Sequence, residues 1–146
     1  MPNRPYAWRV SAETNQALVE RFYDEVVNQR RLETIDELLS EDFVHNGERR
    51  GREGQRQTYE AFFAGFPDLR SEVVAILASG DAVAVHRRWA GTHEGMFQGV
   101  EPTGRSVEFE STAILTVRDG QIAEYRGVVD LLGLMQQLGA APLLSF

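Results

Sequence analysis

The second half of the chain constrains the fold most strongly, because strand-like segments follow one another there with no helix between them. From Leu69 onward, apolar and β-branched residues recur in runs that are broken by Ser-Gly-Asp at 79–81 and Asp-Gly at 119–120. An Asp-Gly pair between two such runs is a strong signal for a two-residue hairpin. Parallel strands need long crossover connections, and none separates these segments. The pattern therefore predicts an antiparallel sheet.

Four strands are expected in this half, beginning near Leu69, at 83, near Arg105 and at Gln121, with a Gly-rich loop over 91–104. In the second strand, Arg87 and Arg88 are adjacent, so their side chains point to opposite faces and at most one points inward. An inward arginine would pair with an inward acid or with an enolate oxygen.

Helical periodicity dominates the first half of the chain. Apolar pairs recur every four residues from Leu18 to Val27, and Ser11 precedes them as a candidate N-cap. This pattern predicts an amphipathic helix of about five turns. The first ten residues are interpreted as an N-terminal extension.

Three shorter helical segments are also expected. One covers 32–39, a second begins near Gly54 and ends at Pro67, and the third, 131–139, is a short amphipathic helix or a turn, while 42–51 has the composition of a loop. Helices that precede an antiparallel sheet indicate an α+β layer architecture.

Composition excludes several classes of function. The 146 residues predict one domain, 1–146, and the net charge of -7 with scattered Lys and Arg argues against a nucleic-acid partner. The absence of Cys excludes disulfides, thiolate nucleophiles and Cys-based zinc sites. No segment has the apolar length of a signal or a membrane span, so we expect a cytoplasmic protein with a small-molecule partner.

Several short motifs, in a fixed order from about Asn15 to Gly139, resemble the SnoaL-like polyketide cyclases (ester cyclases) of the NTF2-like superfamily. They are Asp42-Phe43-Val44-His45-Asn46, Phe66-Pro67-Asp68-Leu69, Gly91-Thr92-His93-Glu94-Gly95, Pro102-Thr103-Gly104, Arg118 to Glu124, Asp130, and Gln137-Leu138-Gly139. The resemblance implies an NTF2-like cone, in which a curved antiparallel sheet wraps around the N-terminal helices.

The resemblance also implies a function. In that family, an aspartate on the last strand is the general acid/base of an intramolecular aldol ring closure that needs no metal or cofactor, and Asp130 is the matching position. The family also places an asparagine in the pocket, which corresponds to Asn46. Its members commonly pair through the open sheet face, so a homodimer is expected.

The residues around Asp130 are compatible with this role and with a second one. Its neighbours Val129 and Leu131 are apolar, and burial raises the pKa of a carboxyl group toward the range in which it can exchange protons. Alternatively, Asp130 is a helix N-cap for 131–138, because Asp is favoured at that position.

The three histidines do not have the spacing of a metal site. His86 and His93 are seven residues apart, which puts them on opposite faces of a continuous strand. His45 is expected either to contact a substrate oxygen or to cap loop backbone. His93 is expected either to close the pocket mouth or to form a structural turn contact.

Aromatic residues provide the candidate lining of a pocket for an apolar polycyclic or polyketide-like ligand. Tyr59, Phe62, Phe63 and Phe66 lie on the third helix, and Trp89 and Tyr125 are candidates for stacking on the ligand. Core packing, sheet packing or a dimer contact are the alternatives for these side chains.

Two alternatives to a cyclase stay open. One is another NTF2-like activity, such as an isomerase, hydroxylase or hydrolase, and the other is a dimeric small-molecule-binding module without catalysis. The chain has Tyr125-Arg126-Gly127 where the family usually has a His-Trp-Asp-like run. This difference favours the binding module without catalysis.

Overall fold

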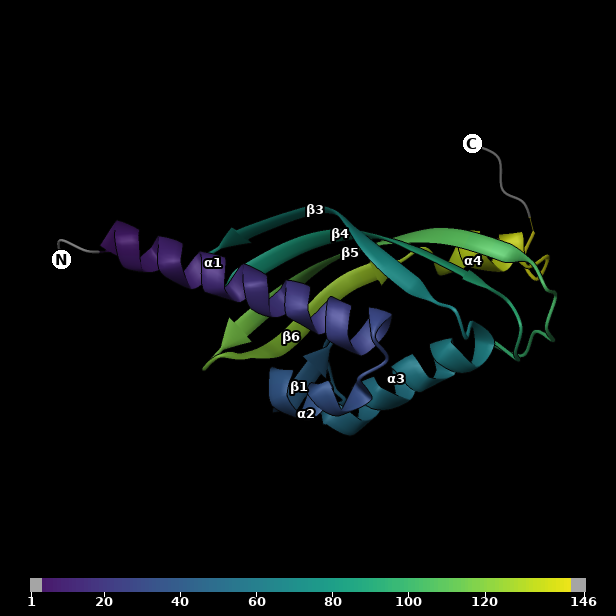
Figure 1. The fold of residues 1–146 in the computed structure, drawn as a ribbon, viewed down its shortest axis with the longest axis horizontal. Helices are drawn as coiled ribbons and strands as arrows, with labels where there is room; N and C mark the ends of the chain where they lie inside the picture. Colours follow the sequence, from purple (N-terminus) through teal and green to yellow (C-terminus); the bar gives the residue numbers. More distant parts are fainter. Residues whose placement is uncertain (1–3, 143–146) are drawn as a thin grey trace.

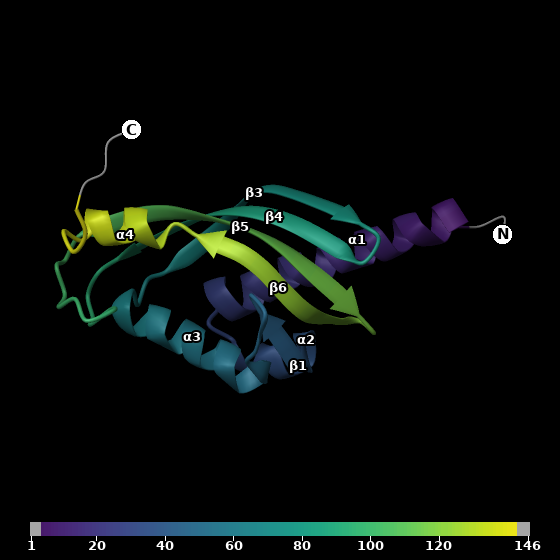
Figure 2. The ribbon, with the colours of Figure 1, turned by 180° about the vertical axis from the view of Figure 1, so that it is seen from behind.

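The computed structural model describes the backbone of residues 4–142 and the side chains of residues 11–142. The N-terminal helices pack against one face of a curved sheet, and the C-terminal helix packs beside the fifth strand (Figures 1 and 2). The helices are α1 (Arg4–Phe22), α2 (Ile35–Leu38), α3 (Gly51–Gly65) and α4 (Leu131–Gln137). The strands are β1 (Leu39–His45), β2 (Glu48–Arg49), β3 (Arg70–Ser79), β4 (Ala82–Thr92), β5 (Ser106–Arg118) and β6 (Gln121–Val129). The α+β class predicted from the sequence is confirmed.

The sheet has the strand order β2-β1-β6-β5-β4-β3. Strands β3 to β6 are antiparallel neighbours, as predicted. The β5–β6 connection is the expected two-residue hairpin, in which Asp119 and Gly120 both have positive φ, at 51° and 74°. Positive φ at both positions matches the right-handed twist of the flanking strands. The Asp-Gly pair alone was therefore enough to predict this hairpin from the sequence.

Strand β1 was not predicted, because 42–51 was expected to be a loop. The segment forms most of β1 and all of β2, and β1 pairs in parallel with β6. The sheet is therefore mixed rather than wholly antiparallel. Exposed Glu41 and Asp42 give the segment a loop-like composition, and its pairing with β6 leaves no local signal.

The first helix begins earlier than predicted. It starts at Arg4, so Ser11 lies inside it and is no N-cap, and Pro5 occupies the first turn, where proline is tolerated. After Phe22 the chain continues as a π-helical turn, Tyr23–Asn28, whose buried residues include Tyr23. Such turns change the direction of side chains locally and are frequent at functional sites.

The core lies between the helices and the concave face of the sheet. Strand β4 contributes Val83, Val85, Arg87 and Trp89 at alternate positions, all buried. Helix α3 ends at Gly65, just before Phe66 and Pro67, as predicted. None of the described helices is both long and apolar enough to cross a membrane.

Candidate functional site

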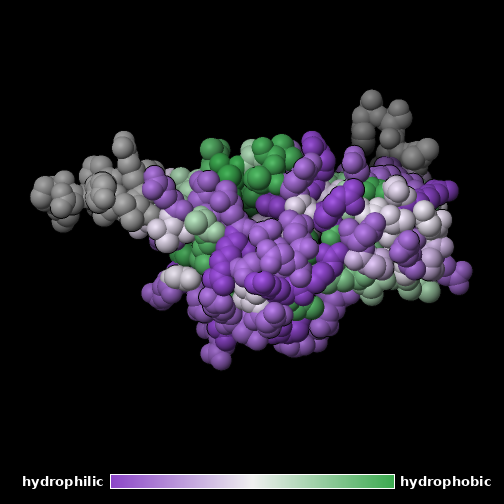
Figure 3. Space-filling view, in the orientation of Figure 1, coloured by the Kyte–Doolittle hydropathy of each residue, from purple (hydrophilic) through white to green (hydrophobic). Residues whose placement is uncertain are grey.

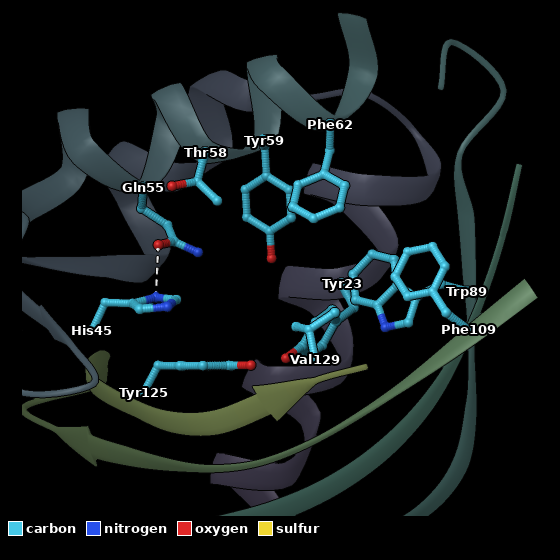
Figure 4. A pocket seen from close by; sticks show the side chains of 10 residues that line it. All are labelled: Tyr23, His45, Gln55, Thr58, Tyr59, Phe62, Trp89, Phe109, Tyr125 and Val129. Carbon is cyan, nitrogen blue, oxygen red and sulfur yellow. Dashed lines mark hydrogen bonds between the residues drawn. The ribbon is translucent and has the colours of Figure 1, made fainter. Parts of the chain in front are cut away.

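A small cavity lies between α3 and the concave face of the sheet (Figure 4). Its volume is about 60 Å³. The residues that line it come from α1's π-helical extension, β1, α3, β4, β5 and β6: Tyr23, His45, Gln55, Thr58, Tyr59, Phe62, Trp89, Phe109, Tyr125 and Val129. One end of the cavity is polar and the other is aromatic.

The polar end is built around His45, the last residue of β1. Its Nδ1 lies 3.2 Å from Oε1 of Gln55, which is on α3 and only 5% exposed. Burial lowers the pKa of His45, and the nearby Arg50 guanidinium lowers it further, while Gln55 and Glu48 oppose the change. The imidazole is therefore held in its neutral form over a wider pH range than a free histidine.

Three tyrosine hydroxyls surround the cavity, those of Tyr23, Tyr59 and Tyr125. In Figure 4 the hydroxyls of Tyr59 and Tyr125 point into the open space between the side chains. Burial raises the pKa of each of the three hydroxyls above its usual value. They are neutral hydrogen-bond donors at physiological pH, suited to a carbonyl or enolate oxygen.

The aromatic end is a stack of rings. Trp89 and Phe109 are parallel within 6°, with centroids 6.1 Å apart, and Trp89 Nε1 donates to Ser111 Oγ at 2.8 Å. Phe62 closes this end from α3 and packs against Phe97. A flat apolar ligand finds a complementary surface here.

Arg87 is the inward member of the Arg87/Arg88 pair. It is buried, its Nε donates to Ser71 Oγ at 2.7 Å, and its guanidinium lies 4.3 Å from the Tyr23 ring centroid. Arg88 is exposed and pairs with Glu72 on the outer face. The Arg87 guanidinium therefore packs on the Tyr23 ring, which lines the cavity, and does not pair with Asp130.

A model of the SnoaL-like polyketide cyclase family matches residues 17–138. The chain belongs to this family. No curated protein matches the chain. The predicted family is confirmed, and every residue that lines the cavity lies within the matched segment.

Solved structures of SnoaL-like proteins share the fold. A candidate SnoaL-like polyketide cyclase from Jannaschia sp. CCS1 has 29% identity and a TM-score of 0.81, with 90% of this chain and 96% of that chain covered. AclR, a candidate hydroxylase from Streptomyces galilaeus, has 30% identity and a TM-score of 0.82, with 90% and 100% covered. IdmH, a candidate polyketide cyclase from Streptomyces antibioticus, has 33% identity and a TM-score of 0.77, with 86% and 98% covered. The NTF2-like cone is confirmed.

Asp130 does not lie at the wall of the cavity of this SnoaL-like protein. It is exposed, it is the N-cap of α4, and its carboxylate accepts a hydrogen bond from the Gly133 backbone N–H at 2.9 Å. The expectation of a poorly hydrated carboxyl group was wrong, because three of its four apolar neighbours are themselves exposed and only Val129 is half-buried. Val128 is 72% exposed on the outer face, and Leu131 and Leu132 are also exposed. The N-cap alternative is confirmed, and a catalytic role for Asp130 stays a prediction.

Five of the predicted lining residues do line the cavity, namely His45, Tyr59, Phe62, Trp89 and Tyr125. Asn46 does not. It is exposed, has a φ of 49°, and forms two hydrogen bonds with the Gly127 backbone, at 2.9 and 3.1 Å. It joins the end of β1 to β6 and so fixes the position of His45.

Phe63 and Phe66 also lie outside the cavity lining. Phe63 is half-buried below the Arg30 guanidinium, at 4.1 Å from its centroid, and stacks on Tyr59. Phe66 is fully buried in the core. The core-packing alternative is therefore correct for Phe66. The two α3 residues that do face the cavity, Tyr59 and Phe62, are three positions apart and so lie on the same face of the helix.

His93 is fully buried behind Phe66, and it does not line the cavity. Its Nδ1 accepts a hydrogen bond from the Thr103 backbone N–H at 3.1 Å and lies 3.0 Å from Thr103 Oγ1. This is the structural turn contact that the sequence left open. Within the described part of the chain, no three His, Asp or Glu side chains gather where they could hold a metal ion.

The sequence missed several lining residues, above all Tyr23, Gln55, Thr58, Phe109 and Val129. Phe109 and Val129 alternate with exposed residues along β5 and β6, so their inward direction could have been found from the strand period. Gln55 gave no signal, because a glutamine on a helix is ordinarily exposed.

Proposed function

We propose that this SnoaL-like protein is a cyclase that closes a ring in a polyketide-type small molecule by an intramolecular aldol reaction, bound in the cavity beneath α3. The observation that supports the proposal is the cavity itself. It combines an aromatic wall, three neutral tyrosine hydroxyls and a neutral imidazole within the family-matched segment. These groups fit a substrate that is flat, apolar and rich in carbonyl oxygens.

The chemistry of an aldol closure needs only proton transfer and charge stabilisation. A proton leaves a carbon flanked by carbonyl groups, the resulting enolate attacks a second carbonyl carbon, and the new alkoxide takes up a proton. The hydroxyls of Tyr59 and Tyr125 are donors for the enolate oxygen, because a buried neutral donor stabilises charge that develops beside it. The proposal involves no cofactor.

The size of the cavity adds a requirement. Ligand pockets for drug-sized molecules are about 300–1,000 Å³, and this cavity is about 60 Å³. A polycyclic substrate therefore enters only if the lining moves outward. Phe62 is the side chain at the aromatic end best placed to move, since it is half-buried in the last turn of α3, whereas Trp89 and Phe109 are buried in the sheet.

The proposed acid/base role of Asp130 requires a movement as well. Its carboxylate would have to leave the Gly133 N–H and turn toward the side on which Val129 lines the cavity. Asp130→Asn tests this role cleanly, because Asn caps a helix as well as Asp does but cannot exchange a proton. Loss of turnover with α4 intact supports the role, and full turnover removes it.

The function is tested by incubating the purified protein with a linear poly-β-keto ester and following the products by liquid chromatography with mass spectrometry, which separates a ring-closed isomer from the linear substrate by retention time. A cyclase gives a ring-closed product of unchanged mass, or of a mass lower by one water after dehydration. A ligand that binds and is recovered unchanged, with no product above the rate without protein, would identify a binding module instead of an enzyme.

A hydroxylase is the second candidate, favoured by the similarity to AclR at 30% identity over the full length of that chain. The same mass spectra separate the two functions. A hydroxylase transfers one oxygen atom of dioxygen to the substrate while the other is reduced to water by an added two-electron reductant, whereas ring closure adds no oxygen and proceeds equally well under nitrogen.

We also propose that the protein forms a homodimer through the outer face of the sheet. Exposed apolar side chains gather there, among them Leu77 on β3, Ile114 on β5 and Val128 on β6. Figure 3 shows hydrophobic residues at the upper edge, over β3. Acidic and basic residues alternate on the same face, as in the Arg88–Glu72 pair, so a second copy related by a two-fold axis can match charge with charge.

A further inference from the structure

We propose that His45 is the general base of the cavity and that Gln55 is its positioning residue, which holds the imidazole in the tautomer with a proton on Nδ1. This inference deepens the proposed function and rests on it for the reaction involved. It concerns a pair of residues, on β1 and α3, that are ten positions apart in the chain.

The tautomer follows from the hydrogen-bond partner. Gln55 presents its carbonyl oxygen, Oε1, to Nδ1 of His45 at 3.2 Å, and a carbonyl oxygen only accepts (Figure 4). Nδ1 must then be the donor. A neutral imidazole has a single N–H, so Nε2 has a free lone pair and is the proton acceptor.

Nε2 is also available to a ligand. It forms no hydrogen bond to any residue that the structure describes, and it is not among the enclosed polar atoms. The ring itself lines the cavity, where it is held from one side by Gln55 and from the other by the stacked Tyr125 ring. The free acceptor and the tyrosine hydroxyls therefore belong to one site.

A glutamine is a suitable partner for a base that works near neutral pH. A carboxylate in its place would stabilise the imidazolium and keep the ring protonated, whereas an amide orients the ring without adding charge. The other polar groups around the ring are Arg50 and Glu48 on the solvent side, and the hydroxyls of Tyr125 and Tyr59.

The proton transfer balances without any co-reactant. Nε2 takes a proton from the carbon between two carbonyl groups, and the C–H electron pair moves into the enolate. The enolate carbon then bonds to the carbon of another carbonyl group farther along the same substrate, and the alkoxide that forms takes the proton back from Nε2. His45 is restored, and the product has the atoms of the substrate.

The tautomer is measured by ¹⁵N NMR of the ligand-free protein above the pKa of His45. We expect the Nε2 resonance of His45 at the shift of an unprotonated nitrogen and the Nδ1 resonance at that of a protonated one. Gln55→Leu should give a mixture of tautomers, while Gln55→Glu should keep the tautomer of the wild type. The opposite tautomer in the wild type would overturn the inference, whatever the enzyme's substrate.

Proton abstraction is measured with acetophenone as a probe, by following deuterium uptake into its methyl group in D₂O by NMR. We expect His45→Gln to lower the protein-catalysed rate by about 10²-fold or more, the usual contribution of a general base. Gln55→Glu should move the acid limb of the pH–rate profile to higher pH, a change that a purely structural residue would not cause. Unchanged exchange in the folded His45→Gln variant would remove His45 as the base.

This probe separates the two proposals. Acetophenone contains no second carbonyl in the same molecule, so its exchange reports on the base and not on ring closure. Exchange that depends on His45, together with no ring closure of any poly-β-keto ester, would retain the base and remove the cyclase. Ring closure that persists in His45→Gln but fails in Asp130→Asn would retain the cyclase and remove this base.

Discussion

His45 and Tyr125 are register partners on the parallel strands β1 and β6, and their rings stack with centroids 4.5 Å apart and planes 16° apart. Stacked aromatic pairs contribute about 0.5–1.5 kcal/mol beyond the area they bury. Tyr125→Phe keeps the stack and Tyr125→Leu removes it. We therefore expect Tyr125→Leu to lower the free energy of unfolding by about 1 kcal/mol more than Tyr125→Phe, measured by urea denaturation. Equal losses in the two variants would show that the stack adds no stability.

The lowered pKa of His45 predicts a dependence of stability on pH. The folded protein holds the imidazole proton less tightly than the unfolded chain, whose histidine has a pKa of 6.5. Between the folded value and 6.5 the unfolded chain therefore binds more protons, so the free energy of unfolding falls as the pH drops through this window and is unaffected above it. We expect the loss between about pH 7.5 and about pH 5 to be smaller in His45→Gln than in the wild type. Carboxylates titrate alike in both proteins, so the difference reports on His45 alone.

Asn46 is expected to contribute to stability rather than to binding. Asn46→Ala removes the two side-chain hydrogen bonds to Gly127. It also leaves an alanine at a backbone φ of 49°, which is unfavourable for that residue. Hydrogen bonds contribute about 0.5–1.5 kcal/mol each, and alanine in this backbone region costs about 1–2 kcal/mol. We expect Asn46→Ala to destabilise the protein by about 2–3 kcal/mol and Asn46→Gly by about 1 kcal/mol less. Chemical denaturation of both variants checks this order, and equal costs would rule out backbone strain at this position.

The sheet could be predicted from the sequence wherever its signals are local. Burial alternates without a break from Val107 to Val117 along β5, and the Asp119-Gly120 turn closes the hairpin to β6. Strand β1 could not be predicted in the same way. It is held by a parallel pairing with β6, in which His45 meets Tyr125 about 80 positions later in the chain, and such a long-range pairing leaves no periodic trace in a short polar segment.

The candidate site could be predicted only in part, for a related reason. Aromatic residues such as Trp89 and Tyr125 show their inward direction through the strand period, but Gln55 is polar and gives no such indication. For Asp130, apolar neighbours suggested burial. Val128 belongs to the open outer face of the sheet, Val129 lines the cavity, and Leu131 and Leu132 are exposed on α4, an arrangement that a single strand does not reveal.

Phe62 is expected to limit the size of the cavity. Phe62→Ala should remove one wall, whereas Phe63→Ala, on the next position of α3 and also half-buried, should leave the cavity unchanged. Both truncations should destabilise the protein, and only the first should strengthen binding of 2-naphthol. We expect a gain of about tenfold, or about 1.4 kcal/mol, by isothermal titration calorimetry. Equal affinities in the two variants would show that the cavity does not expand at Phe62.

The outer face of the sheet provides the last prediction. Leu77 and Val128 are 74% and 72% exposed, which is unusual for large apolar side chains on strands and supports the proposed dimer interface. We expect the wild type to be a dimer by light scattering after size-exclusion chromatography, and Val128→Glu to be a monomer, because a buried unpaired charge strongly disfavours an interface. Met96→Glu, at an exposed position outside this face, should stay dimeric. A monomeric wild type, or a Val128→Glu variant that remains a dimer, would contradict the proposed interface.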